Sequence, residues 1–265
     1  MKRIVVISDL HAGHMVGLTP PQWQFPLNTG NPRRDAVAVI QRACWDFYAR
    51  VLNTLQPIDT LFVLGDCVDG RGGRSGGTEL VTTSLLDQAD MAEEAIQRAR
   101  ARHTRMVYGT PYHVSPDGDD VESVIAAKVG AEITGHDWVD VNGCIFDLKH
   151  KVGGSQVPHG RHTAIARERL WNAMWAEAEG APRASVFLRG HVHYFNHCGG
   201  ASGGRHWLAI TAPALQGPGS KYGVRQCSGT VDYGLMHFDV DENGGYKWQA
   251  HLMPFKAITR QPVRL

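Results

Sequence analysis

The stretch Ile4-Val5-Val6-Ile7-Ser8-Asp9-Leu10-His11 sets the expectation for the whole chain. Four consecutive β-branched residues predict a strand that is buried on both faces, and a carboxylate and an imidazole follow it at once. A polar motif likewise follows each of the predicted strands 60–64, 105–108 and 186–188. The motifs that follow these strands are Gly65-Asp66-Cys67-Val68-Asp69, Gly109-Thr110-Pro111-Tyr112-His113 and Gly190-His191-Val192-His193.

Long amphipathic segments separate these strands and predict helices at 35–56, between 78 and 102, and at 120–129. Asn142-Gly143 predicts a hairpin that joins strands 138–141 and 144–148. A helix at 164–179 and strands at 207–211, 233–240 and 246–252 complete the pattern. We expect an α/β fold, a four-layer αββα sandwich of two mixed sheets flanked by helices, with residues 1–265 forming a single domain. The irregular stretches 15–34 and 199–204 are predicted to be surface loops.

The composition excludes several classes of protein. A net charge of +1 gives no basic excess that would indicate a nucleic-acid surface or an anionic membrane. The first apolar run is too short for a signal peptide, and five widely spaced cysteines contain no Cys-x-x-Cys pair. We therefore expect a cytoplasmic protein with free thiols and no membrane partner. Cys67 lies inside a candidate metal motif, where we interpret it as a small neutral spacer rather than a ligand.

The polar motifs all follow strands, and the carboxyl ends of strands in α/β folds share one edge. His150 is a fifth element of this kind, because it ends the strand after Asn142-Gly143. With 14 His and 30 Gly in the chain, a Gly-His-x-His quartet is expected roughly 0.08 times by chance in a shuffled sequence of this composition. The motifs together therefore predict one site built from distant residues.

The order of these motifs resembles that of the calcineurin-like metallophosphoesterases, and the Gly-Thr-x-x-His variant is similar to the phage or prophage-type members. The resemblance spans residues 9–193. It implies a site for two divalent metal ions, in which Asp9, His11 and His193 hold the first, Asp66 bridges, and His150 and His191 hold the second. Manganese is favoured, since imidazole ligands suit transition metals, with iron, zinc, magnesium or nickel as alternatives.

The sequence departs from this family at the position of its seventh ligand. The family has an Asn after the glycine of its third motif, and this chain has Thr110. The second ion could then be bound less tightly, take a water, or recruit His113. His113 lies two residues later than the family histidine that protonates the leaving group, so acid, ligand and structural roles all stay open.

Further polar residues near the motifs have less definite interpretations. Asp69 is expected to hold a loop or a ligating histidine in place. Arg71, Arg74 and Arg161 could each bind a phosphate through two hydrogen bonds. Similar protein phosphatases have an Arg directly after the second Asp of the second motif, where this chain has Gly70.

The resemblance implies a metal-dependent phosphoester hydrolase in which a metal-bound hydroxide attacks phosphorus and His113 is the candidate catalytic acid. Among substrates we expect a phosphodiester, either a nucleic acid or a nucleotide, which would make the protein a phosphodiesterase or nuclease. A phosphomonoesterase acting on proteins or metabolites is the alternative. A non-catalytic scaffold with the same fold is a third reading, and the retention of six ligand positions counts against it.

Overall fold

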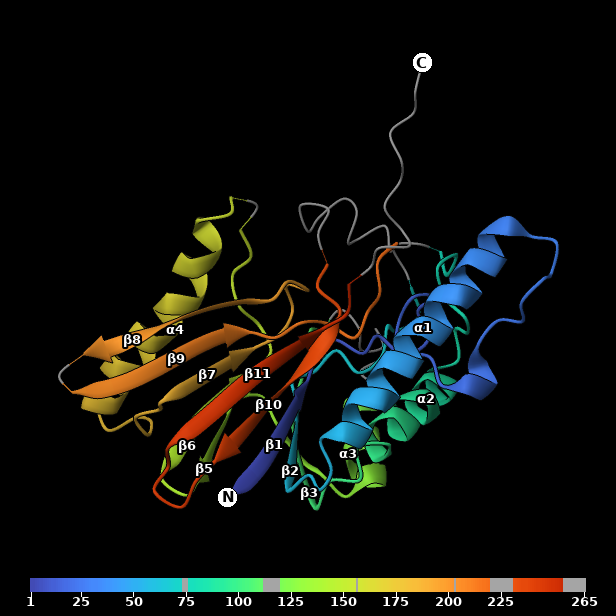
Figure 1. Cartoon of the computed structure of the whole chain (residues 1–265). Helices are drawn as coiled ribbons and strands as arrows, with labels where there is room; N and C mark the ends of the chain where they lie inside the picture. The colour runs from blue at the N-terminus through green and yellow to red at the C-terminus, as the bar shows by residue number, and fades with distance from the viewer. Residues whose placement is uncertain (73–75, 112–119, 156, 203, 220–230, 255–265) are drawn as a thin grey trace.

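The computed structural model describes residues 1–72, 76–111, 120–155, 157–202, 204–219 and 231–254. Its first sheet has six strands in the order β11-β10-β1-β2-β3-β4 (Figure 1). Strands β1 to β4 run parallel, and β10 and β11 add to the other edge in antiparallel fashion. The strands are β1 (Lys2–Ile7), β2 (Thr60–Val63), β3 (His103–Val107), β4 (Glu132–Thr134), β10 (Gly234–Val240) and β11 (Tyr246–Leu252).

The second sheet has five strands in the order β5-β6-β7-β9-β8. Its three central strands are parallel, and an antiparallel strand lies at each edge. Asn142 and Gly143 both have positive φ, as a two-residue hairpin turn between β5 and β6 requires. The strands are β5 (Asp137–Val141), β6 (Cys144–Lys149), β7 (Val186–Arg189), β8 (Asn196–Ser202) and β9 (Arg205–Thr211).

The helices cover the outer faces of the two sheets. Helices α1 (Pro32–Thr54), α2 (Leu85–Gln97) and α3 (Val121–Val129) pack on the first sheet, and α4 (Gly160–Glu177) packs on the second (Figure 1). A short 3-10 turn, Pro21–Trp23, precedes α1. None of the helices in the described ranges combines the length and apolar character needed to cross a membrane.

Both faces of strand β1 are covered, which explains why residues 4–7 are all apolar. Val5 and Ile7 face the helices of the first sheet, whereas Ile4 and Val6 face the second sheet. All four side chains are fully buried because both faces of the strand are covered. The predicted arrangement of two mixed sheets between helical layers is thus confirmed.

The helix ends follow local capping rules. The side chains of Asn31, Ser84 and Asp120 accept N–H bonds in the first turns of α1, α2 and α3. Pro32 occupies the first turn of α1, where its missing N–H costs nothing, and α3 ends at Gly130 with φ +65°. Helix α1 therefore begins three residues before the predicted start at residue 35.

The prediction of a loop at 199–204 was wrong, because residues 196–202 form β8, which pairs with β9. A Cβ on Gly199 would lie 2.8 Å from the Trp207 carbonyl oxygen, so this glycine permits close strand approach. The short strand β4 was also not predicted. The loop expected at 15–34 is irregular up to residue 31, apart from the 3-10 turn.

Candidate metal centre

The polar motifs meet where the carboxyl ends of β1, β2, β3, β6 and β7 lie side by side. Backbone hydrogen bonds join the loops directly, since Asp9 N donates to the Gly65 carbonyl at 3.1 Å and Gly190 N donates to the His150 carbonyl at 2.9 Å. The loops after β1 and β2 come from the first sheet, and those after β6 and β7 come from the second. The site is therefore built across both sheets.

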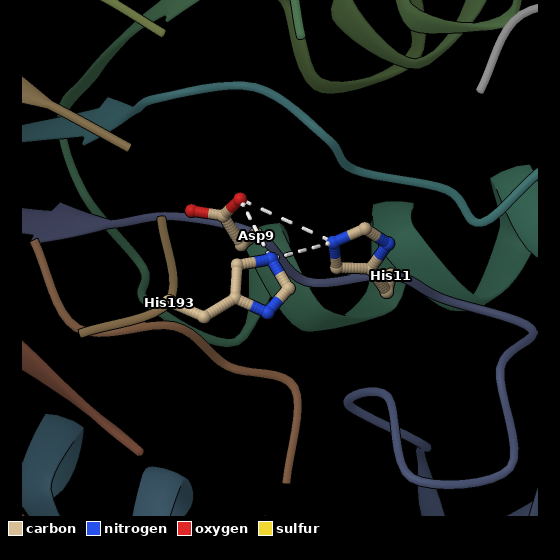
Figure 2. A group of neighbouring side chains, drawn as sticks. All are labelled: Asp9, His11 and His193. Atoms are coloured by element: carbon tan, nitrogen blue, oxygen red, sulfur yellow. Dashed lines mark hydrogen bonds and ion pairs between the residues drawn. The ribbon is translucent and has the colours of Figure 1, made fainter. Parts of the chain in front are cut away.

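One group of side chains consists of Asp9, His11 and His193, all of them buried (Figure 2). His193 Nε2 lies 3.2 Å from Asp9 Oδ1 and 3.1 Å from His11 Nε2. His11 Nε2 is 4.0 Å from Asp9 Oδ1. Two imidazole nitrogens and a carboxylate oxygen thus point at a common centre.

A second group consists of Asp66, His150 and His191. His150 Nε2 lies 3.1 Å from Asp66 Oδ2. The Thr110 hydroxyl joins this group, because its Oγ1 lies 3.2 Å from His150 Nε2, 3.1 Å from His191 Nδ1 and 3.3 Å from Asp66 Oδ2. The sequence left the place of Thr110 open, and the structure puts its side chain among the second group of donors.

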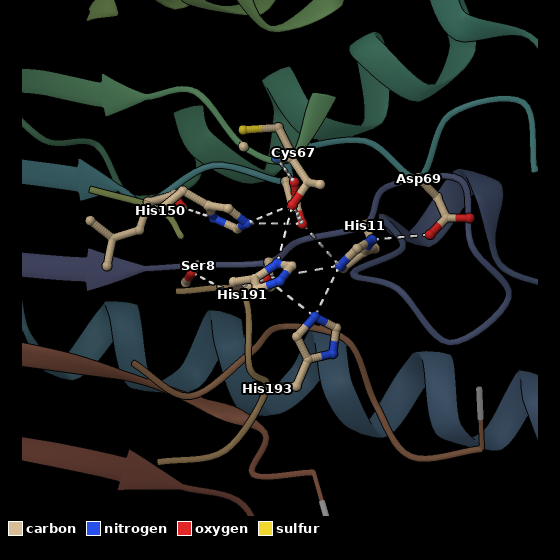
Figure 3. Close-up of polar contacts among 12 residues, drawn as sticks. Ser8, His11, Cys67, Asp69, His150, His191 and His193 are labelled. Atoms are coloured by element: carbon tan, nitrogen blue, oxygen red, sulfur yellow. Dashed lines mark hydrogen bonds and ion pairs between the residues drawn. The ribbon is translucent and has the colours of Figure 1, made fainter. Parts of the chain in front are cut away.

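The two groups are neighbours (Figure 3). Asp66 Oδ2 lies 3.9 Å from His11 Nε2, and the His191 backbone N–H donates to both carboxylate oxygens of Asp9 at 3.1 Å. Each group contains one carboxylate and two imidazoles whose donor atoms lie within 4.8 Å of one another. Such mixed donor sets suit divalent transition metals.

The backbone at this site is held in conformations that most residues avoid. Nine non-glycine residues of the described ranges have positive φ, and five of the six candidate ligands are among them. Each such residue costs on the order of 1–3 kcal/mol and persists only where the surroundings enforce it. This concentration is typical of a functional site. The five are Asp9 (52°), His11 (45°), Asp66 (49°), His191 (74°) and His193 (54°).

The glycines that lead the motifs make room for the ligands. A Cβ on Gly190 would lie 2.3 Å from Ser8 Oγ and 2.9 Å from Asp9 Oδ2. A Cβ on Gly109 would lie 2.2 Å from both the backbone nitrogen and Oδ1 of Asp66. These positions exclude any side chain, which explains in physical terms why the motifs begin with Gly.

The electrostatics of the metal-free site show strong coupling between its charges. Burial opposes protonation of His150, but Asp66 and Asp9 outweigh it and raise the pKa of His150 to about 10. Burial likewise opposes ionisation of Asp9, yet neighbouring His193 and His150 hold the pKa of Asp9 well below its usual value. Burial and nearby His150 lower the pKa of His191. Buried carboxylates that need positive charge beside them fit a cation site.

Other side chains hold the candidate ligands in position. Asp69 Oδ1 lies 3.0 Å from His11 Nδ1, and the Leu64 carbonyl lies 2.5 Å from His150 Nδ1. These contacts fix the ring orientations and leave the opposite nitrogens facing the site. The interpretation of Asp69 as a residue that orients a histidine agrees with this contact. Ser8 Oγ donates to Asp9 Oδ2.

Glu122 was missed in the sequence. It lies in the first turn of α3, where an acidic residue is ordinary, and so gave no signal. Its buried carboxylate accepts the Cys67 N–H at 2.9 Å and the Gly109 N–H at 2.7 Å. Glu122 therefore ties together the two loops that carry Asp66 and Thr110.

The remaining sequence candidates are His113, three arginines and Cys67. His113 and Arg74 lie outside the described residues. Arg71 is exposed, and the Arg161 guanidinium lies 4.1 Å from the ring centroid of Tyr194, the residue after His193. The Cys67 side chain is buried, and burial together with Glu122 raises the pKa of its thiol well above the usual value.

Comparisons with known proteins give likenesses of structure alone. No family model matches the chain, and no curated protein matches it. Vps29 of Entamoeba histolytica, solved with Zn²⁺, has a TM-score of 0.44 at 14% identity over 94% of this chain and 98% of its own. An archaeal phosphodiesterase has a TM-score of 0.44 at 14% identity, over 94% of this chain and 99% of its own. A metallophosphoesterase from Sphaerobacter thermophilus has a TM-score of 0.41 at 14% identity, over 96% of this chain and 89% of its own. These similarities assign no chemistry to this chain.

Proposed function

We propose that the chain is a metal-dependent phosphoester hydrolase whose two donor groups each hold a divalent cation. The observation that carries this proposal is the pair of adjacent buried groups, Asp9 with His11 and His193, and Asp66 with His150 and His191. Structural zinc sites rely largely on cysteine, and these groups contain none. Two adjacent cations, once bound, would supply a nucleophile at neutral pH and offset charge on the phosphoryl oxygens.

The positions of Asp66 and Asp9 indicate which ion each carboxylate would bind. Asp66 Oδ2 faces His150 of its own group at 3.1 Å and His11 of the other group at 3.9 Å. This placement supports Asp66 as the carboxylate shared by the two ions. The Ser8 hydroxyl and the His191 N–H both donate to the Asp9 carboxylate, which fixes its orientation, and Asp9 would bind the first ion with His11 and His193.

Thr110 is proposed as an oxygen donor to the second ion, in the place where the resembling family has Asn. Its hydroxyl lies 3.1–3.3 Å from three donor atoms of the second group, which is hydrogen-bond distance from each of them. A neutral hydroxyl is a weaker ligand than a carboxylate or imidazole. The second ion should therefore bind less tightly than the first.

His113 follows Thr110 by three residues and is proposed as the proton donor to the leaving alkoxide. An imidazole suits this role because its ordinary pKa lies near neutrality. The His113→Asn variant should slow the hydrolysis of esters with poorly acidic leaving groups more than that of p-nitrophenyl esters, because p-nitrophenolate leaves without protonation.

The substrate is proposed to be a phosphodiester. The test is hydrolysis of bis-p-nitrophenyl phosphate and of p-nitrophenyl phosphate by the manganese-loaded and the metal-free protein. We expect metal-dependent activity with preference for the diester, lost in Asp66→Asn and kept in His206→Ala, which alters an exposed histidine on β9. A clear preference for the monoester would overturn the substrate assignment, and equal rates without metal would overturn the mechanism.

A further inference from the structure

The outer face of α4 exposes a cluster of large apolar side chains. Of the eleven such exposed residues in the described ranges, four lie between positions 170 and 175. They are Leu170 (59% exposed), Trp171 (53%), Met174 (55%) and Trp175 (56%). Single exposed apolar residues need no explanation, but a contiguous group with two tryptophans indicates a surface that binds something.

The cluster lies along one side of the helix. Leu170 and Met174 are four residues apart, as are Trp171 and Trp175, so each pair stacks along the axis. Ile165 and Asn172, seven residues apart, are buried on the opposite side, and Ile165 packs in the core cluster of the second sheet. Figure 1 shows α4 as the outermost layer on that sheet, with its other side turned away from the protein.

Two exposed charges of opposite sign border the cluster along the same stripe. Arg167 lies one turn before Leu170, and Glu177 lies one turn after Met174. The stripe is therefore basic at its amino-terminal end, apolar in the middle and acidic at its carboxyl-terminal end. Two such stripes that run in opposite directions therefore place the basic end of each beside the acidic end of the other.

We propose that two copies of this chain associate through these faces of α4, with the two helices antiparallel about a two-fold axis near residue 172. In that register Leu170 of each copy meets Met174 of the other, and Arg167 of each copy meets Glu177 of the other. A two-fold interface requires this reciprocity, since the same patch must serve both partners. The reversed charge pattern favours a second copy over an unrelated partner.

The size of the patch is consistent with the apolar centre of such an interface. A large aromatic side chain buries roughly 150–250 Å², so four half-exposed side chains offer on the order of 400 Å² per copy. A standard interface covers about 800 Å² on each partner. The cluster supplies about half of this, and the flanking polar residues of α4 would supply the rim.

A hollow beside the cluster extends the surface available to the partner. It has a volume of about 410 Å³ and is lined by Trp171, Trp175 and Trp138 of β5 together with charged side chains that include Lys149 and Glu168. The two α4 tryptophans thus border both the exposed stripe and a recess in the protein. This recess offers aromatic surface and charged groups beside the stripe, where the polar rim of an interface would lie.

Sedimentation velocity of the full chain over a range of concentrations tests the proposal. We expect a monomer–dimer equilibrium, and we expect Leu170→Asp to raise its dissociation constant at least about tenfold by placing a charge at the centre of the patch. The matched control is Leu86→Asp on α2, which alters an equally apolar and 72% exposed residue elsewhere and should leave the equilibrium unchanged.

Charge exchange tests the register without relying on a disruptive substitution. Arg167→Glu and Glu177→Arg should each weaken the dimer, and the double variant should restore it, because the reversed pairs again match across the axis. Glu177 also meets Arg183 within its own chain, so circular dichroism must show that each variant keeps its fold. A wild-type chain that is monomeric at every concentration would overturn the proposal, as would a dimer unaffected by Leu170→Asp. A monomer that instead binds lipid vesicles would assign the patch to a membrane surface.

Discussion

Replacing Glu122 by Gln should weaken cation binding by the second donor group more than by the first. Glu122 is 4% exposed, and its two carboxylate oxygens accept the N–H groups of Cys67 and Gly109. Glutamine keeps one acceptor oxygen but turns an NH₂ group toward the other N–H. One hydrogen bond is thereby lost, and one buried donor faces another donor.

The magnitude follows from two opposing effects. Losing a hydrogen bond to a charged group and leaving a buried N–H unsatisfied costs about 1–3 kcal/mol of unfolding free energy. Burial and the nearby Asp66 carboxylate raise the pKa of Glu122, so removing its charge relieves some repulsion. We therefore expect a net loss of about 2 kcal/mol, together with a loss of roughly 10–100-fold in affinity for the second ion.

Calorimetric titration of the metal-free protein with Mn²⁺ resolves the two binding steps. The weaker step should shift clearly in Glu122→Gln, because Glu122 holds the loops of Asp66 and Thr110. The tighter step should shift less, because only Asp66, which the two ions would share, links it to this side chain. Glu242→Gln, in the exposed turn between β10 and β11, is the matched control. Unchanged affinity in both steps would refute the reasoning. An equal loss in both steps would show general destabilisation instead of local positioning.

Variants at three further positions test other parts of the site and its support. Thr110→Val should lower the affinity for the second ion by about tenfold, whereas Thr110→Asn should leave this affinity unchanged. Calorimetric titration with Mn²⁺ measures both. Gly190→Ala should lower the unfolding free energy by about 1–3 kcal/mol, because its Cβ would meet Ser8 and Asp9, and urea unfolding checks this. Burial opposes the ionisation of Asp147, but its bond with His136 and the charge of Arg189 lower its pKa below 3.8. That stabilisation is present above pH 3.8 and is lost as the pH falls through the folded-state pKa. The difference in urea stability between wild type and Asp147→Asn, about 3 kcal/mol near neutrality, should shrink in that acidic range.

The layered fold was predictable because its helices have a clear apolar periodicity and its central strands are continuous apolar runs. The run 4–7 is apolar at every position, and both of its faces proved to be covered. Strand β8 was not predictable in the same way, since Gly199 and Gly200 carry no side chain from which an alternating pattern can be recognised. Its pairing depends on β9, which comes later in the chain.

The candidate site was predictable to the extent that its residues stand in short motifs. The motifs after β1, β2 and β7 named Asp9, Asp66 and His193, and the structure brings these residues together with the other three. Glu122 could not be found, because its contacts are to backbone N–H groups of loops 55 and 13 residues away. The exposure of the α4 cluster also depends on tertiary packing and left no mark in the motifs.

The most direct test of a two-metal hydrolase is a stepwise titration of the metal-free protein with Mn²⁺, in which bound metal and hydrolysis of bis-p-nitrophenyl phosphate are measured on the same samples. We predict two ions per chain, with activity rising as the second, weaker site fills. Fewer than one ion per chain at saturation, with no hydrolysis, would contradict the account and favour a scaffold that has this fold without its chemistry.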